Sequence, residues 1–173
     1  MKGNFGFIHD KIEIKILILF ILRRLPEPIS YDVLTELTMC DDGISYFDFS
    51  ECVAELLKTE HLHCENELYS LTAKGARNGE ITENSLPFTV RMTAENGASV
   101  IRAAQNRNAM IKTSHATKPD GGCAVNLALS DGIGDIVSME LLAANERQAK
   151  ELEKGFRNNA ENIYNALIEM ILE

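Results

Sequence analysis

The feature that most constrains the fold is the run IKILILFIL, residues 14–22, which is apolar at every position except Lys15. Spanning a bilayer takes about twenty apolar residues, so this run is too short to cross one. The RRLPEP that follows does not look like the small-residue cleavage site of a secretion signal. A helix that is hydrophobic nearly all round has to be covered on nearly every side. We therefore expect a buried helix here.

This first helix is expected to run from His9 or Asp10 to Leu25, because the prolines of LPEP end a helix. A short extended segment and a second helix, Tyr31 to Met39 with Ser30 as its cap, follow. Ser45 and Asp48 form an S-x-x-D capping signature for a third helix. Two short strands are predicted around residues 65–67, packing through Leu62, Leu68, Tyr69 and Leu71. A short helix or irregular turn, weakened by Gly75 and Gly79, is predicted over residues 72–87.

From Phe88 the pattern changes to a helix, three strands and a long last helix. Helical spacing extends to about Asn108, and the turn sequences PDGG and DGIG separate the strands AMIKTSHATK, CAVNLALS and DIVSMELLA. The first of these strands is the most polar and is the expected sheet edge. Asn145 is the expected cap of a helix whose apolar stripe continues to about Leu172. The predicted class is therefore α+β, with domains at 1–86 and 87–173.

The run LYSLTAKG, residues 68–75, resembles the end of the wing in winged-helix regulators of the MarR and PadR kind. There a Y-x-L-T-x-x-G pattern closes the hairpin, and here Tyr69, Leu71, Thr72 and Gly75 stand at those places. The whole chain is also similar to an uncharacterised bacterial family of winged-helix proteins, through Tyr46-Phe47, the LPFTVR junction and the terminal NERQAKELEKGF…NIYNAL helix. The resemblance implies an N-terminal winged helix-turn-helix domain, a C-terminal α+β domain for dimerisation or effector binding, and DNA-binding transcription regulation.

The charge of the first half argues against a strong DNA reader. Residues 1–86 carry eight basic and fifteen acidic side chains, a net charge of −7, in a chain of net charge −9. DNA affinity draws on Lys and Arg that displace counterions from phosphates. We expect binding to double-stranded DNA to be weak and steeply salt-dependent, resting on the cations Lys2, Lys11, Lys74 and Arg77, with Ser45, Tyr46, Ser50 and Asn66 as the other contacts. The alternative is a winged-helix protein-interaction module that does not bind DNA and whose acidic face meets a basic partner.

No enzyme, cofactor or metal site is predicted. DGIGD and GARNG lack the strand-to-helix context of a phosphate loop, and no nucleophile–base arrangement is recognisable. A metal-responsive sensor using His61, His63 and a cysteine is a distant third hypothesis, because HLHC has no second close-spaced ligand pair. A small-molecule effector is left open. The four cysteines show no disulfide framework, and no export signal is recognisable. We therefore expect a cytoplasmic protein that is not associated with membranes.

A homodimer is predicted from the apolar surplus of the first and last helices. The last helix keeps its stripe for some seven turns, more than a three-stranded sheet can cover. A winged-helix regulator also commonly needs two copies to contact two half-sites. The expected twofold contact combines Ile18 of the first helix with Phe156, Ile163 and Leu167 of the last.

Overall fold

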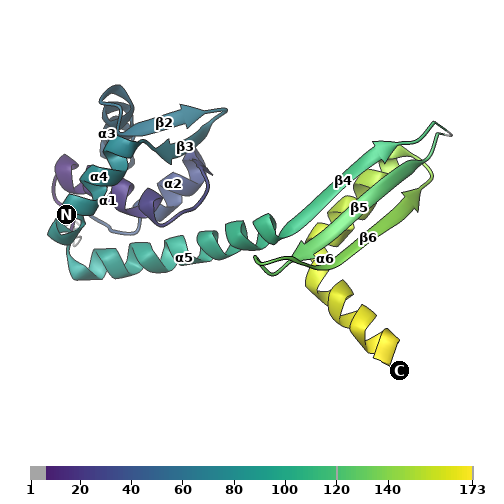
Figure 1. The fold of residues 1–173 in the computed structure, drawn as a ribbon. Helices are drawn as coiled ribbons and strands as arrows, with labels where there is room; N and C mark the ends of the chain where they lie inside the picture. Colours follow the sequence, from purple (N-terminus) through teal and green to yellow (C-terminus); the bar gives the residue numbers. More distant parts are fainter. Residues whose placement is uncertain (1–6, 120, 173) are drawn as a thin grey trace. The chain divides into compact units, whose positions relative to one another are not determined.

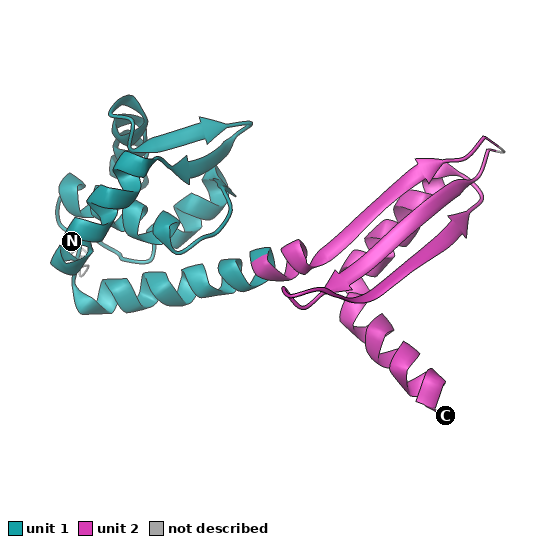
Figure 2. Cartoon of the chain, viewed as in Figure 1, with its two compact units in different colours: residues 1–105 teal, residues 106–173 magenta. Residues whose placement is uncertain are grey.

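The computed structural model describes residues 7–119 and 121–172. The chain divides into two compact units, residues 1–105 and 106–173 (Figure 2). Each unit contains one three-stranded antiparallel sheet, and the described residues form six α-helices in all (Figure 1). The predicted α+β class is confirmed. Among the described residues, no helix combines the length and the apolar character needed to cross a bilayer.

Unit 1 is a helical layer with a small sheet. Its elements are α1 (Lys11–Arg23), β1 (Ile29–Ser30), α2 (Tyr31–Thr38), α3 (Tyr46–Lys58), β2 (Leu62–Glu65), β3 (Leu68–Leu71), α4 (Ala73–Thr82), the 3-10 helix η1 (Glu83–Ser85) and most of α5 (Phe88–Met110). The sheet order is β1-β3-β2, so the two-residue β1 pairs with the inner strand of the β2–β3 hairpin. Helix α1 contacts α2, α3 and α4, which explains why it is apolar on nearly every side.

Short polar side chains set where these helices begin. Ser30 accepts a hydrogen bond from the backbone N–H of Val33, and Ser45 accepts one from that of Asp48 at 3.1 Å. Each satisfies an N–H group that has no partner inside the helix. The predicted caps at Ser30 and Ser45 are confirmed, and so is the buried first helix, in which Leu17, Ile18 and Ile21 are fully covered.

Two details of the first half differ from the sequence-based expectation. Residues 73–82 form a regular helix although Gly75 and Gly79 lie inside it. Both glycines are buried, and a Cβ built on Gly75 would lie 2.0 Å from the carbonyl oxygen of His61. The glycines therefore allow close packing instead of weakening the helix. Leu68, expected to pack, is exposed because it faces outward near the hairpin tip.

Unit 2 is a sheet with one helix across it. Strands β4 (Ile111–Thr117), β5 (Cys123–Ser130) and β6 (Asp135–Ala143) pair in the order β4-β5-β6, so β4 is an edge as predicted. Helix α6 (Glu146–Leu172) lies along one face, as Figure 1 shows. Val125, Leu127 and Leu129 of β5 are buried there. Asn145 accepts a hydrogen bond from the N–H of Gln148 at 2.9 Å, so this cap is also confirmed.

Most of α5 belongs to unit 1, whereas the sequence placed the domain boundary before it. Val90, Ala94 and Ala98 on one side of α5 are buried, and the first two belong to the unit 1 core. Arg24, the C-cap residue of α1, places its Nε 2.8 Å from Glu95 Oε2 of α5. Pro87 marks the start of a helix, but that helix packs against the elements that precede it.

Candidate nucleic-acid interface

The first turn of α3 exposes two adjacent aromatic side chains. Tyr46 is 57% exposed and Phe47 is 75% exposed, while Phe49 two residues later is fully buried. The ring of Phe49 packs against Tyr31, with the ring centroids 5.5 Å apart, and against Tyr46 at 6.3 Å. Burial, with the Tyr46 hydroxyl beside it, raises the pKa of Tyr31 to about 12, so this phenol stays neutral. The inner face of α3 is thus fixed in the core and holds the outer aromatic pair in place.

The carboxylates of α3 are paired with lysines of α1. Lys11 Nζ lies 2.7 Å from Glu51 Oε2 and 3.8 Å from Asp48 Oδ1. Lys15 pairs with Glu55 in the same way one turn further along. The hydrogen bond to Glu51 raises the pKa of Lys11, and the hydrogen bond from Lys15 lowers the pKa of Glu55. These partly exposed pairs contribute little stability, but they offset two of the three negative charges.

The β2–β3 hairpin projects polar residues at its tip. Asn66 and Glu67 both have positive φ, 50° and 64°, which is the backbone of a tight hairpin turn. Residues 63–68 are all exposed. In this part of the chain, Asn66 is the one uncharged amide at the tip and is flanked by Glu65 and Glu67. The hairpin therefore offers hydrogen-bonding groups but no cation at its end.

A hydrogen-bond network joins the base of the hairpin to α3 and α4. The ring nitrogens of His61 lie 2.8 Å from Thr59 Oγ1 and 2.7 Å from Asn78 Nδ2. Thr72 donates its backbone N–H to the His61 carbonyl oxygen at 3.1 Å, and its hydroxyl to that of Glu60 at 2.7 Å. Burial, and then the charge of Lys74, lower the pKa of His61. The network fixes the direction in which the hairpin leaves the core.

The eight residues predicted to contact DNA differ in whether their side-chain polar groups are already bonded within the chain. Lys2 lies outside the described residues, and Lys11 is committed to Glu51. The hydroxyl of Ser45 caps α3, and that of Ser50 donates to the Phe47 carbonyl oxygen at 2.9 Å. Lys74 donates to the Thr59 carbonyl oxygen at 2.8 Å at the end of α3. The remaining three, which are exposed and form no ion pair within the described part of the chain, are Tyr46, Asn66 and Arg77.

Sequence reasoning missed two residues of this surface. Phe47 is the most exposed residue of the α3 first turn. In the sequence it contributes to the family resemblance, but the only sign of its exposure is that it falls outside the helix's apolar stripe. In the sequence Lys15 is only the one polar position of an apolar run, but in the structure it neutralises Glu55. Helical spacing predicts which residues share a face but not which neighbouring helix supplies the opposite charge.

The residues of the sensor hypothesis do not converge. Within residues 7–119 and 121–172, no group of three or more His, Cys, Asp or Glu side chains is placed to hold a metal ion. Both ring nitrogens of His61 are engaged with Thr59 and Asn78. Burial raises the pKa of Cys52 to about 11, which disfavours the thiolate that metal binding needs.

Two of the four predicted dimer residues are unavailable. Ile18 is covered completely in the unit 1 core, and Phe156 is buried between α6 and its sheet. The apolar surplus assigned to α1 is used by its own neighbours α2, α3 and α4. Ile163 and Leu167 remain partly exposed on α6.

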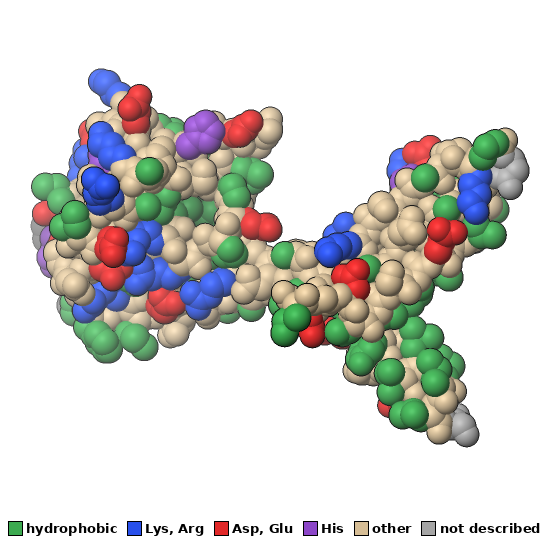
Figure 3. Space-filling model, in the orientation of Figure 1, with side chains coloured by type: hydrophobic (Ala, Val, Ile, Leu, Met, Phe, Trp, Pro, Cys, Tyr) green, Lys and Arg blue, Asp and Glu red, His purple; other side chains and the backbone are tan. Residues whose placement is uncertain are grey.

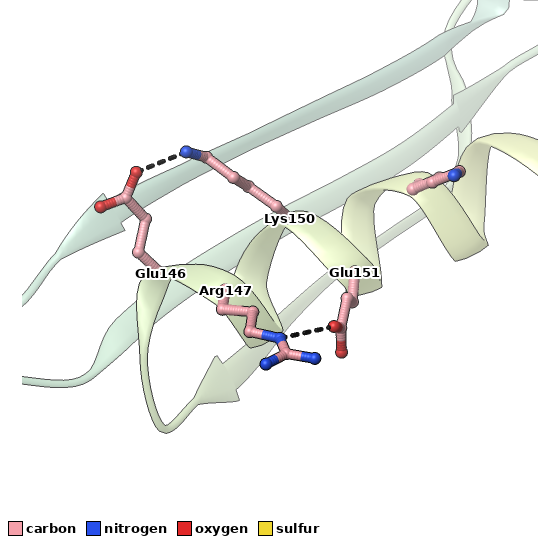
Figure 4. Close-up of a pocket in the computed structure, with 5 residues that line it drawn as sticks. Glu146, Arg147, Lys150 and Glu151 are labelled. Carbon is pink, nitrogen blue, oxygen red and sulfur yellow. Dashed lines mark hydrogen bonds and ion pairs between the residues drawn. The ribbon is translucent and has the colours of Figure 1, made fainter.

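A hollow of about 460 Å³ at the start of α6 is a weaker candidate site. Figure 4 shows its charged lining already paired along the helix. Lys150 Nζ lies 2.6 Å from Glu146 Oε1, and Arg147 Nε lies 3.1 Å from Glu151 Oε1. These are exposed i, i+4 pairs of a solvated helix face. They leave no converging set of free groups for a ligand.

Comparison with known proteins assigns the chain to one family. Residues 14–171 match the family described as Domain of unknown function (DUF4364), and the chain belongs to that family. No curated protein and no solved structure matches the chain.

Proposed function

We propose that this member of the DUF4364 family is a DNA-binding protein of the transcription-regulator type, with unit 1 as a winged helix-turn-helix. Under this proposal α2 and α3 are the helix–turn–helix pair, α3 is the recognition helix and the β2–β3 hairpin is the wing. The order α1, β1, α2, α3, β2, β3 and the sheet order β1-β3-β2 support it.

The observation that carries the proposal is the exposed aromatic pair at the start of α3, beside three carboxylates whose charge two lysines of α1 partly offset. Tyr46 and Phe47 project outward, while Lys11 and Lys15 of α1 hold the nearby carboxylates. Figure 3 shows acidic and basic side chains interspersed over unit 1. An aromatic side chain can contact a thymine methyl group, and a tyrosine hydroxyl can bond to phosphate. The acidic sequence of α3 is therefore less repulsive to DNA than its composition suggests.

The free cations limit the affinity. Lys11 is paired with the Glu51 carboxylate, whereas Lys74 donates to a neutral carbonyl oxygen and forms no ion pair among the described residues. Lys74 and Arg77 are therefore the described cations that remain of those predicted to contact phosphate. Two phosphate contacts give a slope of log K against log salt of about −1.8. This is about half the dependence expected from the four cations that the sequence suggested. We therefore expect weak binding per protomer.

A second candidate function follows from the same aromatic pair. Exposed aromatic side chains are enriched at protein–protein interfaces, so Tyr46 and Phe47 could anchor a protein partner instead of DNA. Unit 1 would then be an interaction module that keeps the shape of a winged helix.

The two functions are separated by fluorescence anisotropy with labelled random duplex DNA in about 50 mM salt, a concentration at which phosphate contacts are strong. We expect the double variant Tyr46→Ala/Phe47→Ala to weaken binding by about tenfold or more. Phe88→Ala is the matched control, because Phe88 is an equally exposed aromatic side chain of unit 1 at the start of α5. Binding that is unchanged in the double variant would remove α3 as the reading element, and no binding by the wild type would favour the interaction module.

A further inference from the structure

The C-terminal turns of α6 carry apolar side chains that the described residues of unit 2 leave exposed. Met170 is 65% exposed and Ile171 76% exposed, and Leu167 is partly exposed one turn earlier. These three residues, called the α6 tail stripe below, continue the helical spacing of Phe156, Ala160 and Ile163. Figure 1 shows the last turns of α6 extending past the end of the sheet, and Figure 3 shows hydrophobic side chains gathered on them.

An open apolar groove lies next to this stripe on the same unit. Its volume is about 570 Å³. It runs between β6 and α6, because α6 packs mainly on β4 and β5. Its apolar side chains, called the α6 groove below, are Leu127, Met139, Leu141, Leu152, Phe156 and Ile163.

We propose that the α6 groove of one chain receives the α6 tail stripe of a second copy of this chain, in an antiparallel helix pair centred on Ile163. Ile163 is the last residue of the α6 groove along the chain, and the tail stripe begins one turn later at Leu167. A twofold axis at Ile163 therefore places each tail in the other chain's groove at the same time. Such an interface is isologous, with the same surface used on both subunits. The inference concerns unit 2 alone and is independent of DNA binding by unit 1.

The spacing on α6 favours a helix as the occupant. Phe156, Ala160, Ile163, Leu167 and Met170 alternate at four and three residues, which is the seam spacing of paired helices. The sheet covers the first part of this seam and leaves the last part open. Glu169 is the one charged side chain among residues 162–172, so this surface has few groups that could form ion pairs with a charged partner. A second α6 matches both the spacing and the lack of charge.

The surface area that each chain would bury in this interface indicates a reversible dimer. A fully exposed aliphatic side chain presents on the order of 100 Å² of apolar area, so the tail stripe and an equal part of the groove bury roughly 400 Å² per chain. Apolar atoms make up a little over half of a typical interface, which gives roughly 700 Å² in total per chain. That is close to the roughly 800 Å² per partner of a specific complex. We therefore expect a dimer whose population depends on concentration in the micromolar range.

The test is the mass of the full chain in solution by sedimentation velocity, from about 1 to 100 μM, the range set by the expected interface size. Dimer formation at the upper concentrations is the expected result. Met170→Asp should raise the dissociation constant at least about tenfold, because it places a carboxylate in the groove. Asn165→Asp is the matched control, since it adds the same charge on the opposite, exposed side of α6. The 19.2 kDa monomer at all concentrations, or a dimer that Met170→Asp does not weaken, would overturn the proposal.

A cysteine test checks the antiparallel register. In a Cys64→Ser background, which removes the exposed native cysteine, Ile163→Cys should form a disulfide-linked dimer on mild oxidation. Asn158→Cys, on the exposed far side of α6, should not. Equal crosslinking of the two variants would overturn the register. Flotation with phosphatidylcholine–phosphatidylglycerol vesicles examines the competing occupant, and a monomer that floats with them would assign the stripe to a lipid surface instead.

Discussion

Replacing Gly75 with alanine tests how tightly α4 packs on the base of the hairpin. A Cβ at this position would lie 2.0 Å from the His61 carbonyl oxygen and 3.0 Å from its carbon. Backbone atoms cannot rotate away as the end of a flexible side chain can. Helix α4 would have to move by about 1 Å, and the movement would strain the two hydrogen bonds of Thr72 to His61 and Glu60.

The expected cost is the balance of three terms. Overpacking costs about 1–3 kcal/mol, and each of the two strained hydrogen bonds is worth about 1 kcal/mol. Alanine gains about 1 kcal/mol over glycine inside a helix. Gly75→Ala should therefore lower the free energy of unfolding of unit 1 by about 3 kcal/mol.

Gly155→Ala is the matched control, because it is the same change inside α6 and no side chain or other element of the same chain lies within 4 Å of the added Cβ. Because Gly155 lines the α6 groove, the control is measured at protein concentrations low enough for the chain to be monomeric. It should stabilise unit 2 by about 0.5–1 kcal/mol. Urea denaturation followed by circular dichroism measures the free energies, and hydrogen exchange of peptides from each unit separates them if the units unfold independently. A neutral or stabilising effect of Gly75→Ala would refute the close approach of α4 to His61.

Three further substitutions test other parts of unit 1. Leu56→Ala should cost about 2–5 kcal/mol in urea denaturation, because Leu56 is buried in the core, whereas Leu68→Ala, at an exposed strand position, should cost less than about 1 kcal/mol. The hydrogen bond from Arg24 lowers the pKa of Glu83, so the ionised Glu83 stabilises unit 1 above the ordinary glutamate pKa, and this stabilisation is lost as the pH falls below that value. Glu83→Gln should therefore flatten the acid side of the pH–stability curve, whereas Glu80→Gln, at an exposed site on α4, should leave the curve unchanged. Burial lowers the pKa of His61, so the unfolded chain protonates this histidine before the folded chain does, and unit 1 loses stability as the pH falls below about 6.5. In a series of melting temperatures against pH, His61→Gln should remove this loss of stability. A loss that survives in His61→Gln but vanishes in the exposed control His63→Gln would assign the effect to His63.

Local signals in the sequence were enough to place most elements. Ser30, Ser45 and Asn145 each precede a helix that begins at the next residue, because a cap acts within one turn. The strands Cys123–Ser130 and Asp135–Ala143 match the segments between the turn sequences. These features depend on neighbours in the chain, so a single sequence contains them.

Features that depend on distant neighbours could not be predicted. The sequence shows that Glu51 and Glu55 share one side of α3, but not that Lys11 and Lys15 of α1 lie opposite them. It shows glycines in residues 73–82, but not that the His61 carbonyl occupies the space that a side chain would need. It shows one apolar stripe on α6, but not that the sheet ends before the stripe does.

The most direct test of the DNA-binding proposal is equilibrium binding of the full chain to random duplex DNA at two salt concentrations. At about 50 mM salt we expect a dissociation constant no weaker than the range of non-specific binding at physiological salt, about 10⁻⁴–10⁻⁶ M. Raising the salt to about 200 mM should weaken binding by about tenfold, as two phosphate contacts per protomer predict. The double variant Lys74→Ala/Arg77→Ala should bind more weakly at about 50 mM salt and lose most of this salt dependence. An absence of binding at about 50 mM salt with the protein near 100 μM, the weak end of that range, would contradict the proposal.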